Sequence, residues 1–296
     1  KSDLELKFEK TSNDNYLKIF NFESPLMKEN NDVLESKITL NLEHEDYYFT
    51  TSFEQYETLN GTNSDRYQHV LPTYNFTKNF IIQNFNGSFN LNSSGNNTLT
   101  STNDLSSIVS NNLDYNSYNQ YFNNGVKSNY GFSLKNINTL GKKNSLYKNS
   151  PQSELMSSYI FNASLPLIKN TNKSINSLEP KMSFRFSPHE MKTNSALERR
   201  VDINNIYNNN RLSMDNSYEG GESFTIGLDY KKNKITYKNN IKEIEDFLEF
   251  KIATVFRDKE EKNIPTNSTL DKKQSNIFGQ LNFKPNSVFS LNYDFS

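Results

Sequence analysis

The residues of this chain that could perform chemistry are few and scattered. Its three histidines, His44, His69 and His189, form no pair at the spacing of metal ligands, and no HExxH motif occurs. Serine is plentiful, but no histidine lies in a recognisable nucleophile motif of a Ser-His hydrolase. The sequence therefore predicts that the chain is not an enzyme.

No other sequence motif points to a cofactor, a metal ion or nucleic acid. The chain has no P-loop, no GxGxxG motif and no cysteine. The acidic cluster of Glu243, Glu245 and Asp246 lacks the glycine and the ligand spacing of a calcium loop, so we interpret it as a solvated face. The net charge is −1, from 33 Lys and Arg against 34 Asp and Glu. Because there is no basic excess, we expect no nucleic-acid partner, and we expect no cofactor.

An alternation of apolar and polar residues runs through most of the chain and predicts the elements that position any site. In residues 222–230, ESFTIGLDY, every second side chain is apolar. The same period recurs in residues 126–135, 178–186 and 289–295. Successive side chains of a β-strand face opposite sides. The sequence therefore predicts a long series of strands, each with one apolar and one polar face.

Alternation fits a soluble β-sandwich as well as a transmembrane β-barrel, so composition has to separate them. Hydrophobic residues make up only 33% of the chain, yet Phe (22) and Tyr (17) are abundant. That make-up favours strands with one apolar face around a polar interior. No run approaches the ~18 apolar residues of a membrane helix. We therefore predict an all-β fold, a transmembrane antiparallel β-barrel.

The predicted connections between strands are uneven in length. Short turns are predicted at Asn233 and at Pro285-Asn286, and long polar loops at 142–152, 187–221 and 257–274. Short turns on one side and long loops on the other are typical of outer-membrane barrels.

One segment carries two periodicities. A helical spacing of three and four joins Ile241, Ile244, Leu248, Ile252 and Val255. A strand spacing joins Leu248, Phe250, Ile252 and Phe256. We favour a strand from about residue 246 onward because the neighbouring segments are strands.

Prolines and glycines mark special backbone positions in these strands. Pro72 in HVLPTY and Pro180 in SLEPKM lie within otherwise good strand patterns. Because proline donates no ladder hydrogen bond, each is predicted at a strand start, an edge or a bulge. Gly220 and Gly221 end a long polar loop and are predicted to give a flexible approach to the strand at 222.

Four segments resemble the LPS-assembly protein LptD family, in the family's order. Residues 11–22 (TSNDNYLKIFNF) look like its "SDxxYLxxYxF" strand pair, and residues 68–76 (QHVLPTYNF) like its "P-x-LP-x-x-x-Y" segment. Residues 177–188 (SLEPKMSFRFSP) look like its "LEP" strand. Residues 205–230 resemble the "NLF…R.SG.DR.EGG…GL.Y" region of alphaproteobacterial members. The chain departs from that pattern at 215–218, where no arginine precedes EGG. The family-motif positions are Pro72, Pro180, Glu219, Gly220 and Gly221.

The resemblance implies a function in the outer membrane of a Gram-negative bacterium. Members of the family form a very large barrel that receives lipopolysaccharide from a periplasmic Lpt bridge and passes it through a jellyroll and a lateral opening into the outer leaflet. The lipoprotein LptE plugs the barrel, and no covalent chemistry is done there. Residues 1–296 are then expected to be part of a single barrel domain, with the terminal strands and the periplasmic jellyroll outside this chain.

In such a barrel the polar faces of the strands line the lumen. The candidate lumen-facing residues are Lys127, Lys135, Lys181, Arg185 and Lys251. A polar lumen can solvate sugars and phosphates and hold a plug by hydrogen bonds, with selectivity from pore shape and charge.

Three other functions fit parts of the pattern. A general porin would be a smaller, complete barrel without a plug. A soluble β-sandwich adhesin would bury its apolar faces against each other. A barrel lipase would need a serine and a histidine brought together by the fold.

Overall fold

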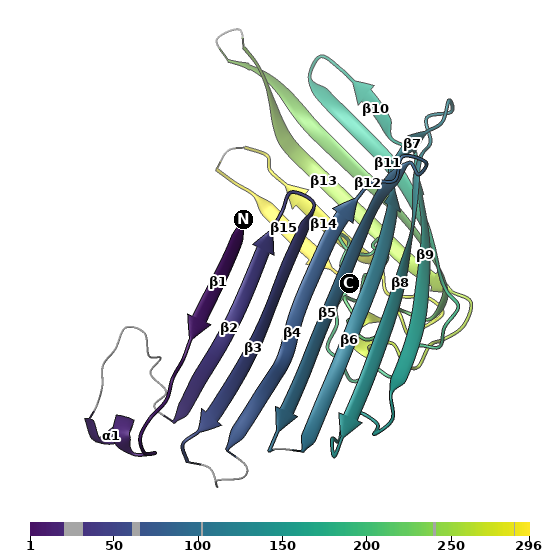
Figure 1. Cartoon of the computed structure of the whole chain (residues 1–296). Coiled ribbons are helices and arrows are strands. Elements are labelled where there is room, and N and C mark those ends of the chain that lie inside the picture. The colour runs from purple at the N-terminus through teal and green to yellow at the C-terminus, as the bar shows by residue number, and fades with distance from the viewer. Residues whose placement is uncertain (21–31, 61–65, 102, 239–240, 287) are drawn as a thin grey trace. The chain divides into compact units, whose positions relative to one another are not determined.

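The chain folds as antiparallel β-strands that follow one another along the sequence (Figure 1). The structure is a computed structural model and describes residues 1–20, 32–60, 66–101, 103–238, 241–286 and 288–296. The strands are β1 (Ser2–Lys7), β2 (Val33–Glu43), β3 (Tyr47–Thr58), β4 (Tyr67–Phe80), β5 (Gly87–Thr100), β6 (Asp104–Ser117), β7 (Gln120–Tyr121), β8 (Lys127–Lys142), β9 (Gln152–Ser164), β10 (Leu167–Asn170), β11 (Ser174–Ser187), β12 (Gly221–Lys238), β13 (Ile241–Arg257), β14 (Phe278–Phe283) and β15 (Leu291–Phe295). Two short helices, α1 (Tyr16–Phe20) and η1 (Thr266–Ser268), interrupt them. The all-β prediction is therefore confirmed.

The strands pair in a simple up-and-down order. The hydrogen-bonded sequence is β1-β2-β3-β4-β5-β6-β8-β9-β11-β12-β13-β14-β15, with β7 on β8 and β10 on β11. Apart from β7 and β10, the strands from β2 to β13 contain 11 to 18 residues. At a rise of about 3.4 Å per residue and a tilt of about 45°, eleven residues span the roughly 25 Å apolar band of an outer-membrane barrel. The strand lengths fit part of such a barrel.

The chain divides into two compact units. Unit 1 contains residues 1–82, 89–114 and 135–155, and unit 2 contains residues 83–88, 115–134 and 156–296. Strand β8 contributes residues to both.

In strands β11 and β12 of unit 2, the apolar face is exposed and the polar face is buried, which is the reverse of a soluble sheet. The apolar side chains of β11 and β12 are exposed, with Phe184 at 44% and Ile226 at 41%. The polar side chains between them are buried, with Ser183 at 3% and Thr225 at 2%. A β-sandwich would bury the apolar face instead. This inversion is the pattern of a strand with lipid on one side.

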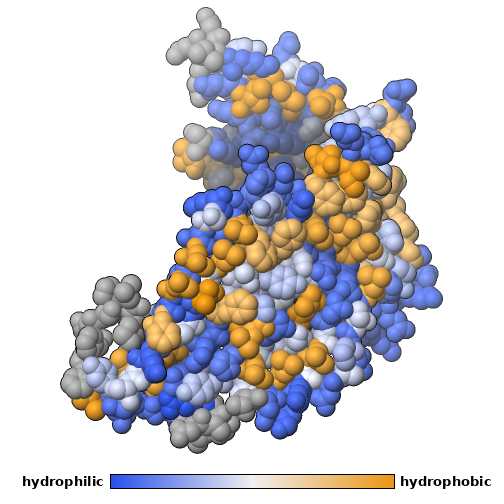
Figure 2. Space-filling model, viewed as in Figure 1, coloured by the Kyte–Doolittle hydropathy of each residue, from blue (hydrophilic) through white to orange (hydrophobic). Residues whose placement is uncertain are grey.

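Unit 1 also exposes apolar side chains along its strands. Leu4 and Leu6 of β1 pair with Leu40 and Ile38 of β2, and Leu6 is 69% exposed. In the space-filling view, hydrophobic residues gather in patches on the visible face (Figure 2).

The main hydrophobic core of unit 2 comes from the long connections after β11 and β13. Its buried residues are Met191, Val201, Ile203, Ile206, Leu212, Met214, Ala253, Val255, Ile264, Leu270 and Phe278. Ala253 and Val255 belong to β13 and Phe278 to β14, and the others belong to residues 188–220 and 258–277. The loops predicted at 187–221 and 257–274 therefore exist, but they pack on the strands instead of extending into solvent.

The strand pair predicted for residues 11–22 is wrong where the structure describes it. Residues Tyr16–Phe20 form α1, and positions 21 and 22 lie outside the described residues. Asn13 starts the turn, because its side-chain oxygen accepts a hydrogen bond from the Asn15 amide at 3.0 Å. Leu17 is then buried against Leu34 and Leu59, which fixes the helix in place.

The short turn predicted at Asn233 is also wrong. Strand β12 continues to Lys238, and its pairing with β13 shifts register between Lys232 and Asn233. Pro285 and Asn286 do lie between β14 and β15, as predicted.

The strand predicted from about residue 246 is confirmed, although it begins earlier, at Ile241. The residues at the helix-like spacing do not share one face of this strand. Lys232 pairs with Leu248, whereas Ile235 pairs with Ile244, so Ile244 and Leu248 lie on opposite faces of the sheet. Phe247 has no partner in this ladder, so it is an extra residue in β13. Because of it, Ile244 and Leu248 face opposite sides of the sheet, although residues four apart in a regular strand face the same side.

Pro72 lies at a bulge, one of the three predicted settings. The pairing of β4 with β5 shifts register between Val70 and Thr73, so Pro72 has no partner in that ladder. Pro180 lies where the pairing of β11 passes from β9, at Lys181, to β10, at Leu178. Both prolines therefore occupy breaks in a ladder, where a missing N–H costs little.

Candidate functional site

The polar face of β11, β12 and β13 is covered by the connection of residues 188–220, which we name the inner connection. Its apolar residues, among them Ile206 and Leu212, pack against Ala253 and Val255 of β13. Local turns shape it: Asp202 accepts backbone hydrogen bonds from Asn204 and Asn205. The inner connection thus has its own small core on a face that the strands alone would leave polar.

A buried ionic cluster centred on Glu219 fastens the inner connection. Arg211 makes a bidentate contact with its carboxylate, with Nε to Oε2 at 2.8 Å and Nη2 to Oε1 at 2.6 Å. Arg257 Nη1 also contacts Oε1, and Arg185 Nη1 lies 3.8 Å from Oε2. The four side chains are at most 3% exposed. Such desolvated, charge-assisted hydrogen bonds are among the strongest in proteins.

The same arginines join three strands to the loop backbone. Arg185 of β11 donates to the backbone oxygens of Asn209 and Glu219 at 2.9 and 2.6 Å. Arg211 donates to Ser223 Oγ and Thr225 Oγ1 of β12. Arg257 of β13 donates to the Gly220 backbone oxygen. The cluster therefore fixes both ends of the last turn of the inner connection.

Glu219 stays ionised in this position. Burial raises its pKa, but the nearby Arg211, Arg185 and Arg257 lower it by more, so the pKa of Glu219 lies well below the ordinary carboxyl value. The cluster carries three positive charges and one negative charge among these four residues.

The ionised state of Glu219 gives the protein a specific pH dependence. A carboxyl whose pKa is lower in the folded state contributes stability above its unfolded pKa of about 4.3, and this contribution is lost as the pH falls towards the folded pKa. We expect the difference in denaturant midpoint between wild type and Glu219→Gln to be largest near pH 7 and to shrink below about pH 4. A difference that stays constant from pH 7 to pH 3 would contradict this.

Gly221 and Gly220 do not form the flexible approach that was predicted. Gly220 is buried, and an added Cβ there would lie 3.2 Å from Met191 Cβ. Gly221 has a φ of +75°, in the left-handed region that favours glycine. The pair forms a fixed turn that lets Arg257 reach the backbone.

Replacing Gly221 with alanine is expected to destabilise the protein by about 1–2 kcal/mol, because an L side chain is strained at this φ. Space is not the cause, since the nearest atom to an added Cβ, Arg257 Nη2, lies 3.4 Å away. Denaturant unfolding of the detergent-solubilised protein measures the effect. Gly221→Asn is the control, because asparagine tolerates the left-handed region better and should lose less.

The five candidate lumen residues all lie on the polar side of their strands. Lys181, Arg185 and Lys251 alternate with exposed or half-buried apolar neighbours in unit 2. Lys127 begins β8 in the same unit. Lys135 belongs to unit 1 and is buried, at 4% exposure.

The structure does not bring these five residues together. Lys181 Nζ contacts Asp229 at 2.6 Å, and Lys251 Nζ contacts Glu249 at 3.0 Å. Only Arg185 joins the Glu219 cluster. Lys127 and Lys181 lie on either side of Glu179, at 3.9 and 3.7 Å, so three of the lysines are paired with carboxylates across or along the polar face.

Sequence reasoning missed Arg211 and Arg257, although it singled out Glu219. Arg211 contacts Glu219, although the arginine that the family pattern has just before EGG is missing at 215–218. The available signal was composition: only six of the 33 basic residues are arginines, and three of these six meet at Glu219.

The fold brings one serine and one histidine within reach of each other. Ser157 Oγ and His189 Nε2 are 3.3 Å apart. Among the described residues, no third side chain orients the His189 ring by a hydrogen bond, so the pair lacks the support of a catalytic triad. In the same residues, no three His, Cys, Asp or Glu side chains gather as a metal site requires.

None of the helices in the described part of the chain has the length and apolar character needed to cross a membrane.

A family model described as LptD, LPS transport system D, matches residues 2–296. A search of curated proteins found no match. Because the family match covers nearly the whole chain and agrees with the antiparallel strands and their exposed apolar faces, the chain belongs to the LptD family, which transports lipopolysaccharide for assembly at the outer membrane.

Proposed function

We propose that residues 1–296 form part of a single barrel domain whose polar strand faces line a passage for lipopolysaccharide into the outer leaflet. The observation that carries this proposal is the inverted burial of β11 and β12, whose apolar side chains are exposed and whose polar side chains are buried. Lipid covers the apolar face, and water and polar groups meet the other. Acyl chains can leave sideways into lipid, where the apolar faces already lie.

The polar face has the chemistry to guide a head group of sugars and phosphates. Lys127, Lys135, Lys181, Arg185 and Lys251 are proposed to face the lumen. Lys181 and Lys251 lie beside carboxylates, so the wall presents both hydrogen-bond donors and acceptors without a large net charge. Such a wall favours passage over tight retention, because a conduction path needs weak, repeated contacts.

The proposed partners are lipopolysaccharide, the plug lipoprotein LptE and the periplasmic Lpt bridge, and the proposed location is the outer membrane of a Gram-negative bacterium. The bridge would act through a jellyroll outside residues 1–296. The resemblance in the sequence and the family match support these assignments. We propose no catalytic step.

Depletion of the full-length protein in its host tests the proposal. New lipopolysaccharide should fail to reach the cell surface, as measured by surface labelling of a pulse of newly made lipid. The purified protein should also carry a lipoprotein in stable complex. Unchanged surface delivery, together with open-pore conductance of a lone barrel, would favour the general porin instead. Solubility of the purified protein without detergent would favour the β-sandwich adhesin.

A further inference from the structure

We propose that Lys169, Lys232 and Lys234, which we name the outer lysines, bind the phosphate of an anionic glycerophospholipid in the membrane around the protein. They belong to β10 and β12, both in unit 2. Lys169 and Lys234 are exposed and Lys232 is half-buried, so a lipid headgroup can reach all three. The site lies outside the passage and goes beyond the proposed function. It rests on that function only because the apolar face is taken to meet lipid.

The register of unit 2 places the outer lysines on the same face as the exposed apolar side chains. The pairing of β11 with β12 has no register shift, so every second residue of β12 shares one face. On the outward face these residues are Phe224, Ile226, Leu228, Tyr230, Lys232 and Lys234. The apolar face of β12 therefore ends in two lysines.

The neighbouring strands arrange the outward side chains in rows. The last apolar row contains Leu167, Leu178, Tyr230, Phe250, Leu281 and Tyr293. The next row contains Lys169, Asn176, Lys232, Leu248, Phe283 and Leu291. Lys169 and Lys232 are two strands apart, so their Cα atoms are about 10 Å from each other. Their long flexible side chains can both reach one phosphate between them.

The level of this row matches the boundary between hydrocarbon and headgroups. The outward apolar residues of β12 run from Phe224 to Tyr230 and are centred on Gly227. A strand tilted by about 45° rises about 2.4 Å per residue along the membrane normal. Lys232 then lies about 12 Å and Lys234 about 17 Å from the centre of an apolar band roughly 25 Å tall. Lys232 is therefore at the edge of the band and Lys234 among the headgroups.

Tyr230 has the orientation of a tyrosine at a membrane interface. Its ring belongs to the last apolar row, and its hydroxyl donates to Asn176 Oδ1 in the lysine row at 3.2 Å. An amphipathic ring with one apolar and one polar end is common at this level of a membrane protein. The tyrosine and the lysines thus agree on where the apolar band ends.

The ring of Phe247 holds two of the outer lysines close together. Phe247 is the extra residue of β13, and it packs edge to face against Phe283. Lys232 Nζ lies 5.3 Å and Lys234 Nζ 4.6 Å from the centre of the Phe247 ring. Cation–π attraction offsets part of the repulsion between the two ammonium groups. Two positive charges held near one ring attract an anion more strongly than either charge alone.

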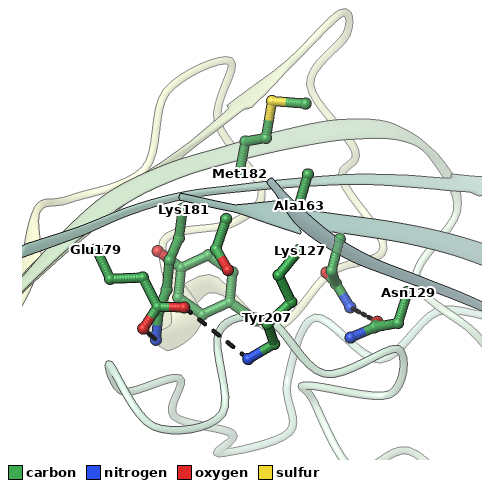
Figure 3. A pocket seen from close by; sticks show the side chains of 9 residues that line it. Lys127, Asn129, Ala163, Glu179, Lys181, Met182 and Tyr207 are labelled. Atoms are coloured by element: carbon green, nitrogen blue, oxygen red, sulfur yellow. Dashed lines mark hydrogen bonds and ion pairs between the residues drawn. The ribbon is translucent and has the colours of Figure 1, made fainter. Parts of the chain in front are cut away.

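The outer lysines also lack the carboxylate partners of the inward-facing lysines. In Figure 3, Lys181 extends to the side on which Tyr207 lies, and Met182 extends to the opposite, outward side. The inward-facing Lys181 contacts Asp229 at 2.6 Å. Within the described part of the chain, none of the outer lysines forms such an ion pair. A phosphate therefore meets lysines that no carboxylate already neutralises by direct contact.

The charge of the outward face differs between the two ends of these strands. The row of Lys169 and Lys232 contains two lysines and no carboxylate. Glu245 lies opposite Lys234 in the register, so the next row adds one charge of each sign. At the other end of β12, the first outward residue beyond Phe224 is Glu222. Only the lysine end thus has the charge that suits a phosphate on this face of β12.

The lengths of the connections favour the periplasmic leaflet for the lysine end. At this end β12 and β13 are joined between Lys238 and Ile241, and β14 and β15 by residues 284–290. The long connections 188–220 and 258–277 lie at the other end. In outer-membrane barrels the short turns face the periplasm. We therefore assign the outer lysines to a glycerophospholipid of the inner leaflet and not to lipopolysaccharide of the outer leaflet.

Crosslinking from lipid to the full-length protein in vesicles tests the proposal. The vesicles contain phosphatidylcholine and a small fraction of phosphatidylglycerol that carries a diazirine next to its headgroup, and mass spectrometry locates the crosslinks. Phosphatidylcholine with the same diazirine is the matched neutral probe. We expect phosphatidylglycerol to label β10 and residues 230–248 in excess over phosphatidylcholine. Lys169→Gln and Lys232→Gln should each lower this excess about fivefold, which corresponds to about 1 kcal/mol per lysine at an anionic surface.

Two further variants sharpen the test. Lys234→Gln should have a smaller effect, because Glu245 lies opposite it. Lys231→Gln is the control, since Lys231 is the neighbouring residue on the inward face and contacts Asp246 at 2.9 Å. It should leave the excess unchanged. Thermal unfolding checks that each variant is folded.

Three outcomes would overturn the site. Equal labelling by the two phospholipids, or an excess that survives glutamine at all three outer lysines, would remove the site but leave the apolar face in lipid. Stronger labelling by lipid A with the same diazirine would assign the lysines to lipopolysaccharide instead. Absence of labelling by every lipid would remove the membrane face itself, and with it the proposed function, so the two failures are distinguishable.

Discussion

Replacing Glu219 with alanine is expected to release the inner connection from the strands and to destabilise the protein by about 3–5 kcal/mol. The loss is large because the substitution leaves Arg185, Arg211 and Arg257 buried at 3% exposure or less without their shared carboxylate. Like charges then face one another in a desolvated site. Trypsin cleavage in the inner connection, for example after the exposed Arg200, should become faster in the folded protein.

Glu198→Ala is the matched control, because Glu198 is an exposed carboxylate in the same connection. It should change neither the stability nor the cleavage rate by a measurable amount. A second variant separates the loss of charge balance from the loss of packing. Combining Glu219→Ala with Arg257→Met removes one of the stranded charges and should recover part of the stability. Equal stability of wild type and Glu219→Ala would show that the cluster does not hold the connection.

Alternation predicted the strands because the period of two is a local property of the chain. In β12 the residues expected on the apolar face, such as Phe224 and Ile226, are indeed the exposed ones, and Thr225 is buried. The alternation of apolar and polar residues predicts which side chains share a face of a strand, but it does not predict what covers that face. The cover over the polar face of β11–β13 comes from residues 188–220, whose packing depends on contacts far apart in sequence.

Local exceptions to the period arise from single residues. The register shift at Lys232 moves Ile244 and Leu248 to different faces, although residues four apart in a regular strand share a face. The Asn13 side chain turns the backbone before Tyr16–Phe20, where a strand was expected. Both effects depend on one residue each, so an average over a window misses them.

The candidate site could be predicted only in part. Arg185 was selected for its face and Glu219 for its motif, but nothing in the sequence places Arg211 and Arg257 on the same carboxylate. These contacts join residues up to 38 positions apart. The rarity of arginine in a lysine-rich chain is the relevant signal, because the planar guanidinium makes the bidentate contact that lysine does not provide.

Replacing Ile226 with arginine tests which face meets lipid. Ile226 is 41% exposed, and its partner Met182 on β11 is 42% exposed. In water, such an exposed position tolerates a substitution within about 0.5 kcal/mol. On the lipid face of a barrel, arginine costs about 2–4 kcal/mol at the midplane of the bilayer and about 0–1 kcal/mol near the interfaces. We expect a loss towards the upper end, because Ile226 lies between Phe224 and Leu228 on the same apolar face.

Urea unfolding of the full-length protein reconstituted in lipid vesicles measures this cost. Ile226→Leu, which keeps the position apolar, should remain within about 1.5 kcal/mol of wild type. The same arginine variant in a zwitterionic detergent should lose less, since a thin micelle lets the guanidinium reach water. A lipid-specific loss identifies the face of β12 that carries Phe224, Ile226 and Leu228 as the membrane face. An equally small loss in vesicles and in detergent would mean that water covers this face, and the polar face could then no longer be the wall of a passage.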